Sequence, residues 1–330
     1  MSPSQESSAV PEYFPFFDPG DGGKALSWPA KIGISVGLGL AYGLLQLLSL
    51  SDKTVFIAQY CWVLSIIITT SLLALYVATL VFRQCLRVLF EFEAGSGTTA
   101  KVINSMLTDK AFLIFAAVFA TLTTGAAHTL GIPADLHESP LALAVNYLGY
   151  FMASFSSGLG TWAIFGVITL YLRFAPNLQF TIDPQNPDGN GGIKLLGESL
   201  WFFALLIAVI GLLVAGYMFS VEWTNLRSPI ARAFFLIWLA LPFTLAVSVI
   251  LIPGLAVRRQ IDQYKARRFE ELKKERANAY ASFKEFEADD DDSIISAKRE
   301  LNDKIHSIQD ELDKLERMRN SPLDGRGASR

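Results

Sequence analysis

Residues 199–219 read SLWFFALLIAVIGLLVAGYMF and contain no charged side chain. An α-helix rises 1.5 Å per residue, so about 20 apolar residues cover the hydrocarbon core of a bilayer. This stretch therefore predicts a transmembrane helix. The composition agrees, because the chain is 52% hydrophobic and 18% charged, whereas soluble domains carry about 25% charged residues. We expect an integral membrane protein.

Five further stretches of the same kind occur in the chain. The six expected spans are residues 32–50, 56–82, 111–132, 143–172, 199–219 and 230–257. They pair into three helical hairpins and predict an all-α polytopic fold. An even number of spans places the two ends of the chain on one side of the membrane.

The distribution of Lys and Arg predicts the orientation, because short loops rich in these residues stay in the cytosol. One side holds Lys24, Lys31, Arg83, Arg87, Lys101, Lys110, Arg173, Lys194, Arg258 and Arg259. The other side holds Lys53, Arg227 and Arg232. We therefore expect cytosolic N- and C-termini, and we place the protein in a bacterial inner membrane.

Charge density divides the chain into regions. Residues 1–29 are polar and rich in Pro and Gly, and we expect a flexible cytosolic tail there. Residues 30–257 form the six-helix transmembrane domain. Residues 258–320 are densely charged and predict a cytosolic helical hairpin or coiled coil, and residues 321–330 predict a disordered end.

The fourth span is the most polar, and small residues recur in it every four positions. This stripe consists of Gly149, Ala153, Ser157 and Thr161. Two interpretations stay open. The stripe is either a tight helix crossing whose hydroxyls bond back to their own helix, or a hydroxyl-lined permeation path. In the sixth span, Pro242 removes a backbone hydrogen bond and predicts a kink or hinge.

The charged C-terminal region contains an apolar seam with alternating spacings of four and three residues, which is typical of a coiled coil. The seam consists of Leu301, Ile305, Ile308, Leu312 and Leu315. A bulkier stripe precedes it at Phe269, Leu272, Arg276, Ala279, Phe283 and Phe286. The pattern favours a hairpin of two helices, and the alternative is one interrupted helix that pairs with its copies in an oligomer. A basic cluster at the start of this region, Arg258 to Lys274, is suited to anionic lipid headgroups or to ordinary retention in the cytosol.

A short element, Pro187-Asp188 followed by Gly191-Gly192, lies before the fifth span. In this element and in the layout of the C-terminus, the chain resembles a group of uncharacterised bacterial multipass membrane proteins. Those relatives often have His where this chain has Asn186. The resemblance implies the multipass fold with a cytosolic helical C-terminus, and it implies no activity.

Motifs of known chemistry are missing from the sequence. It contains no G-x-S-x-G elbow, no P-loop and no H-E-x-x-H pair. The loop of Asn186, Asp188 and Asn190 lacks the twelfth-position Glu of an EF-hand, and the group His128, Asp135, His137 and Glu138 lacks a zinc spacing. We expect no catalytic residues, no metal, no cofactor and no nucleic-acid partner.

The spans contain no central Asp, Glu, Lys or Arg, which argues against proton relays and voltage sensing. The leading hypothesis is a non-enzymatic, oligomeric, channel-like or membrane-perturbing protein whose cytosolic helices sense or dock a soluble partner. The alternative is a membrane scaffold that recruits a partner and conducts nothing. A small-solute transporter ranks third.

Overall fold

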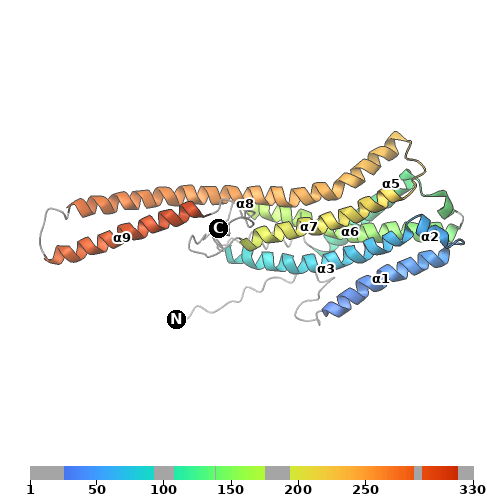
Figure 1. Ribbon diagram of the computed structural model, residues 1–330, viewed down its shortest axis with the longest axis horizontal. Helices are drawn as coiled ribbons and strands as arrows, with labels where there is room; N and C mark the ends of the chain where they lie inside the picture. Colours follow the sequence, from blue (N-terminus) through green and yellow to red (C-terminus); the bar gives the residue numbers. More distant parts are fainter. Residues whose placement is uncertain (1–25, 93–107, 138, 175–193, 286–291, 319–330) are drawn as a thin grey trace.

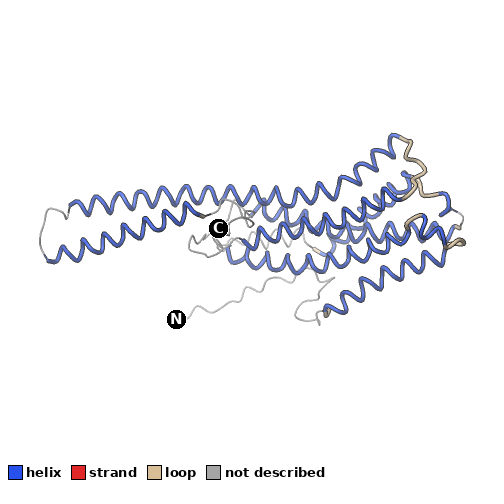
Figure 2. Tube along the Cα trace, in the orientation of Figure 1, coloured by secondary structure: helices blue, strands red, loops and turns tan. Residues whose placement is uncertain are grey.

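The computed structural model describes residues 26–92, 108–137, 139–174, 194–285 and 292–318, and within these ranges it contains helices and no strand. The elements are α1 (Trp28–Ser49), α2 (Thr54–Ala58), α3 (Cys61–Phe92), α5 (Asp109–Leu130), the 3-10 turn η1 (Ala134–His137), α6 (Pro140–Phe174), α7 (Lys194–Ser220), α8 (Pro229–Glu285) and α9 (Asp292–Arg317). Figure 2 shows the same all-helical chain as a tube.

Six of these helices are long and apolar enough to cross a membrane: α1, α3, α5, α6, α7 and α8. This confirms the all-α fold with six apolar spans. Large apolar side chains cover the outside of the bundle, and Leu40, Leu122 and Phe219 are 67%, 66% and 68% exposed. Exposed apolar surface of this extent is compatible with contact to lipid.

The second span begins later than the sequence predicts. We expected a helix from Phe56, but the chain forms the short α2, turns at Gln59 and Tyr60, and starts α3 at Cys61. Tyr60 has a φ of 53°, which a continuous helix does not allow. The Gln59 amide donates a hydrogen bond of 2.9 Å to Asp135, in the turn after α5. A tertiary contact therefore lies directly at this helix boundary.

Four helices close a ring, because α3 packs on α6, α6 on α8, α8 on α7 and α7 on α3. Outside the ring, α1 lies against α3 and α6, and α5 lies against α6 and α8. Figure 1 shows the spans running side by side along the long axis of the molecule. The ring is the frame that positions the candidate site.

The last span does not end where its apolar stretch ends. Helix α8 continues from Pro229 to Glu285, past the domain boundary expected at residue 257, and projects beyond the bundle. Helix α9 lies antiparallel to the second half of α8 (Figure 1), and Leu272 of α8 packs with Ile308 and Leu312 of α9. The C-terminal region is thus a hairpin within one chain, joined to the bundle by a continuous helix.

Candidate functional site

The four ring helices and α5 together enclose a cavity of about 200 Å³, lined by α3, α5, α6, α7 and α8. On α3 the lining runs from Leu64 to Phe82, which is a length of about 27 Å at 1.5 Å per residue. The hydrocarbon core of a bilayer is about 30 Å thick. The cavity therefore extends along nearly the full depth that the spans are able to cross.

The cavity wall is mainly apolar, and its polar atoms are hydroxyls. The seven Ser and Thr residues in the wall are Ser71, Thr79, Thr123, Ser154, Ser156, Ser157 and Thr161. The described lining residues include no Asp, Glu, Lys or Arg. Such a wall favours apolar groups, because an ion in this space would lose its hydration without gaining charged partners.

Most of these hydroxyls use their proton within their own helix. Ser157 donates to the carbonyl oxygen of Ala153 at 2.9 Å, and Thr161 donates to that of Ser157 at 2.8 Å. Thr79, Thr123 and Ser156 bond back by one turn in the same way. The donors of these five hydroxyls are therefore satisfied, and their oxygens can still accept a hydrogen bond.

The stripe predicted from the fourth span is divided between two roles. Ala153, Ser157 and Thr161 line the cavity. Gly149 lies one turn earlier on α6, and a Cβ there would overlap the Tyr42 ring of α1. Gly149 is therefore a packing residue between α6 and α1, whereas the other three face the cavity.

Pro242 also belongs to the cavity wall. A Cβ on Gly211 of α7 would lie 2.8 Å from the Pro242 Cβ, so these two residues bring α7 and α8 into close contact. Figure 1 shows α8 changing direction in its first half, which contains Pro242. The sequence identified the proline but not its partner Gly211. A hinge motion at Pro242 stays a prediction.

Three aromatic residues close the end of the cavity that lies farthest from the hairpin, which we call the far end. They are Tyr150, Tyr217 and Trp223, and all three are in the cavity wall. The two tyrosine hydroxyls are hydrogen-bonded at 3.0 Å, and the Trp223 ring centroid lies 6.3 Å from that of Tyr150 and 6.2 Å from that of Tyr217. We did not identify this cluster from the sequence, because its members belong to α6, α7 and the following loop.

The residues considered as metal ligands in the sequence have other partners. The His128 ring is hydrogen-bonded to the Tyr147 hydroxyl at 2.6 Å, and Asp135 accepts from Gln59. Glu138 and residues 175–193, with the glycine-rich element, lie outside the described residues, as do residues 1–25 and 319–330.

The hairpin buries the predicted seam. Ile305, Ile308, Leu312 and Leu315 of α9 are buried, and Leu301 is partly exposed. The seam faces the bulky stripe of α8, where Leu272 is fully buried and Phe269 packs beside it. Since α9 uses this face against its own chain, the same side chains are not available to a second copy while the hairpin is closed.

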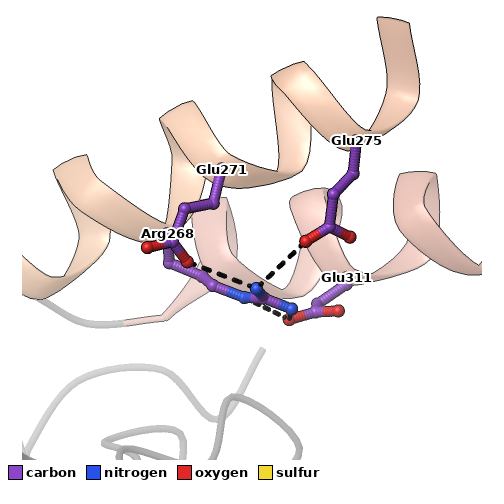
Figure 3. Close-up of polar contacts among 4 residues, drawn as sticks. All are labelled: Arg268, Glu271, Glu275 and Glu311. Carbon is purple, nitrogen blue, oxygen red and sulfur yellow. Dashed lines mark hydrogen bonds and ion pairs between the residues drawn. The ribbon is translucent and has the colours of Figure 1, made fainter. Parts of the chain in front are cut away.

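Arg268 binds the two helices of the hairpin together (Figure 3). Its guanidinium lies 2.8 Å from a Glu311 oxygen on α9, and 3.4 Å and 3.6 Å from Glu271 and Glu275 on α8. A second contact between the two helices is a hydrogen bond of 2.7 Å, which the Arg276 guanidinium donates to the side-chain oxygen of Gln309. The sequence placed Arg268 in a basic cluster suited to anionic lipid headgroups or to retention in the cytosol, and in the structure its guanidinium contacts carboxylates of the hairpin.

Comparisons of the chain with known protein families, with curated proteins and with solved structures found no match. The function must therefore be argued from the cavity, the far end and the hairpin.

Proposed function

We propose that this chain is a non-enzymatic membrane protein that accommodates a small apolar or amphipathic molecule, such as a lipid chain, in its central cavity. The apolar wall carries this proposal, because burial of apolar surface is the interaction that the lining residues offer. The cavity is long and narrow, which suits an extended hydrocarbon chain better than a compact polar solute. The described residues of the cavity wall include no charged side chain that would position a substrate for a reaction.

The proposal extends to the hairpin, whose position would depend on whether the cavity is occupied. Trp238, Pro242 and Val249 of α8 line the cavity, and the same helix continues to Glu285 without interruption. A change in the bend of α8 would therefore move the hairpin without a flexible linker in between. In the expected orientation, the exposed polar face of the hairpin would then dock or release a soluble cytosolic partner.

A channel-like function is the second candidate. The observation that favours it is the length of the cavity, together with the Ser157 and Thr161 oxygens in its wall. Ion flux through liposomes that contain the purified protein would separate the candidates. Flux that changes when these two positions are altered supports a channel, and its absence at every voltage supports binding or scaffolding.

Filling the cavity is expected to prevent occupancy. In the double variant Ser157→Leu, Thr161→Leu, the added methyl groups occupy the space next to both residues. Photolabelling with a diazirine-bearing palmitic acid, followed by mass spectrometry, should mark cavity residues of the native protein, and the variant should lose this labelling by about tenfold, equivalent to 1.4 kcal/mol of binding free energy.

The matched control is Thr121→Leu, Thr244→Leu. Both of these hydroxyls also bond back to their own helix, but they are exposed on the outside of the bundle. Labelling of the cavity should be unchanged in this control. Equal labelling of cavity residues in both double variants, or labelling confined to the outer surface of the native protein, would refute the proposed occupancy.

A further inference from the structure

A second pocket, of about 530 Å³, lies at the far end of the bundle and shares one residue with the central cavity. Its wall includes the polar side chains of Gln59, Asp135, Glu222 and Arg227. The shared residue is Trp223, which lines both the pocket and the cavity. One indole ring therefore borders both a polar pocket and an apolar cavity.

The Trp223 ring is buried in the core cluster at this end of the bundle. It is 8% exposed and packs against the rings of Tyr150 and Tyr217. Its indole N–H donates a hydrogen bond of 2.8 Å to the carbonyl oxygen of Met218. Movement of the ring away from both spaces would require this hydrogen bond to break.

The backbone next to Trp223 is fixed by hydrogen bonds to the end of α5. Thr224 N–H donates to the Gly131 carbonyl oxygen at 3.1 Å, and Asn225 N–H donates to that of Leu130 at 2.9 Å. Gly131 has a φ of 82°, and a Cβ there would lie 2.9 Å from the Asn225 nitrogen, so glycine is required. The loop between α7 and α8 is thus hydrogen-bonded to the end of α5, which holds the backbone of the residues after Trp223 in place.

We propose that the far-end pocket is the entrance to the cavity for a small amphipathic molecule, and that Trp223 is the barrier in this entrance. The polar end of the molecule would remain among Gln59, Asp135, Glu222 and Arg227, whose charges of both signs suit a neutral or zwitterionic head. The apolar end would pass Trp223 into the cavity. This inference rests on the proposed function, in which the cavity receives an apolar chain.

The barrier can be tested by cysteine accessibility. Cys61 and Cys85, the two cysteines of the chain, are replaced by alanine, and Ser154→Cys is introduced as a reporter one turn from Tyr150 in the cavity wall. The protein is placed in lipid nanodiscs, in which both faces are in contact with water. The probe is a membrane-impermeant quaternary-ammonium methanethiosulfonate, and the rate of modification is measured.

Trp223→Ala should raise the modification rate of the reporter by about tenfold or more, because a closed barrier leaves only a minor open population. Trp223→Phe, which keeps a ring, should change the rate much less. The control Trp201→Ala removes a tryptophan that is 54% exposed on the outside of the bundle, and it should have no effect. Equal rates in Trp223→Ala and Trp201→Ala would overturn the proposal.

Folding is checked with a second reporter, Ala142→Cys, because Ala142 is 2% exposed and packs in the core outside the cavity wall. This reporter should stay unmodified in Trp223→Ala. If Ala142→Cys becomes reactive in Trp223→Ala, the Ser154→Cys rate is measured in Trp223→Leu instead, since leucine preserves apolar packing while removing the ring.

The two proposals can fail separately. If Trp223→Ala leaves the modification rate of Ser154→Cys unchanged while the palmitic acid probe still labels the cavity, the proposed entrance is refuted and the proposed function stands. If the modification rate rises but the probe does not label the cavity, the barrier at Trp223 stands and the proposed function is refuted.

Discussion

Replacing Gly39 with leucine is expected to separate α1 from α3 and to destabilise the bundle by about 3 kcal/mol, at the upper end of overpacking costs. A Cβ at Gly39 would lie 2.7 Å from the Ser65 carbonyl oxygen and closer still to the Thr69 hydroxyl. The backbone oxygen cannot rotate away, so the helices must move apart and lose the close packing that holds helices together in lipid. Unfolding in increasing SDS, followed by tryptophan fluorescence, measures this loss.

The control for this variant is two residues away. Gly37→Leu places the same side chain on the same helix, but no heavy atom lies within 4 Å of a Cβ at Gly37. Its free energy of unfolding should therefore stay within about 0.5 kcal/mol of the native value or rise slightly, since leucine is the better helix former. Similar losses in both variants would show that helix α1 is not held by its Gly39 face.

The double variant Ile305→Asp, Ile308→Asp is expected to release α9 from α8. Both side chains are buried, at 7% and 5% exposure, and Ile308 packs on Leu272. Each aspartate replaces apolar contact with a carboxylate that has no partner in the seam, and the combined cost is about 4 kcal/mol or more. The apolar cluster of the hairpin is small, so its remaining contacts cannot offset this loss of free energy. The transmembrane spans should remain folded.

Hydrogen exchange measured by mass spectrometry would follow this release. Amides of α9 and of the second half of α8 should lose protection, while those of α3 and α6 keep it. The matched control is Asn302→Asp, His306→Asp, because both of these residues are exposed on α9. Protection of α9 that is retained in the seam variant, or lost equally in the control, would contradict the assignment of the seam.

Arg268 adds a charged contribution to the same hairpin. Its contact with Glu311 is partly shielded from water, since the two side chains are 29% and 31% exposed. Pairs of this exposure contribute little individually, about 1 kcal/mol or less, so the apolar seam must supply most of the stability. The contact joins Arg268 of α8 to Glu311 of α9 in the register in which the two helices pack.

The expected spans could be predicted because each depends on one property of a continuous stretch. Length and hydrophobicity are local, so residues 199–219 already identified α7 and the same criterion located the other five apolar helices. The spacing of Ile305, Ile308, Leu312 and Leu315 predicted one buried face in the same way, although the spacing alone could not decide whether the partner was α8 or a second copy.

Features that depend on two distant segments could not be predicted. Gly37 and Gly39 are equivalent as small residues in α1, and only the position of α3 makes Gly39 a contact and leaves Gly37 open. The break at Tyr60 lies beside the hydrogen bond between Gln59 and Asp135, which are 76 positions apart. In the same way, Gly149 packs against α1 and Ser157 lines the cavity only because of where the other helices lie.

The amino-acid sequence by itself determined that this chain forms six apolar helices and a charged, seam-bearing C-terminal region, because solvent preference and helical periodicity act residue by residue along the chain. The tertiary structure decided which helices close the ring, that the bundle contains a cavity, and that Trp223 borders both this cavity and a polar pocket. These features arise from contacts between α3, α5, α6, α7, α8 and the α7–α8 loop, and the energy of such contacts depends on the positions of several segments in space at once.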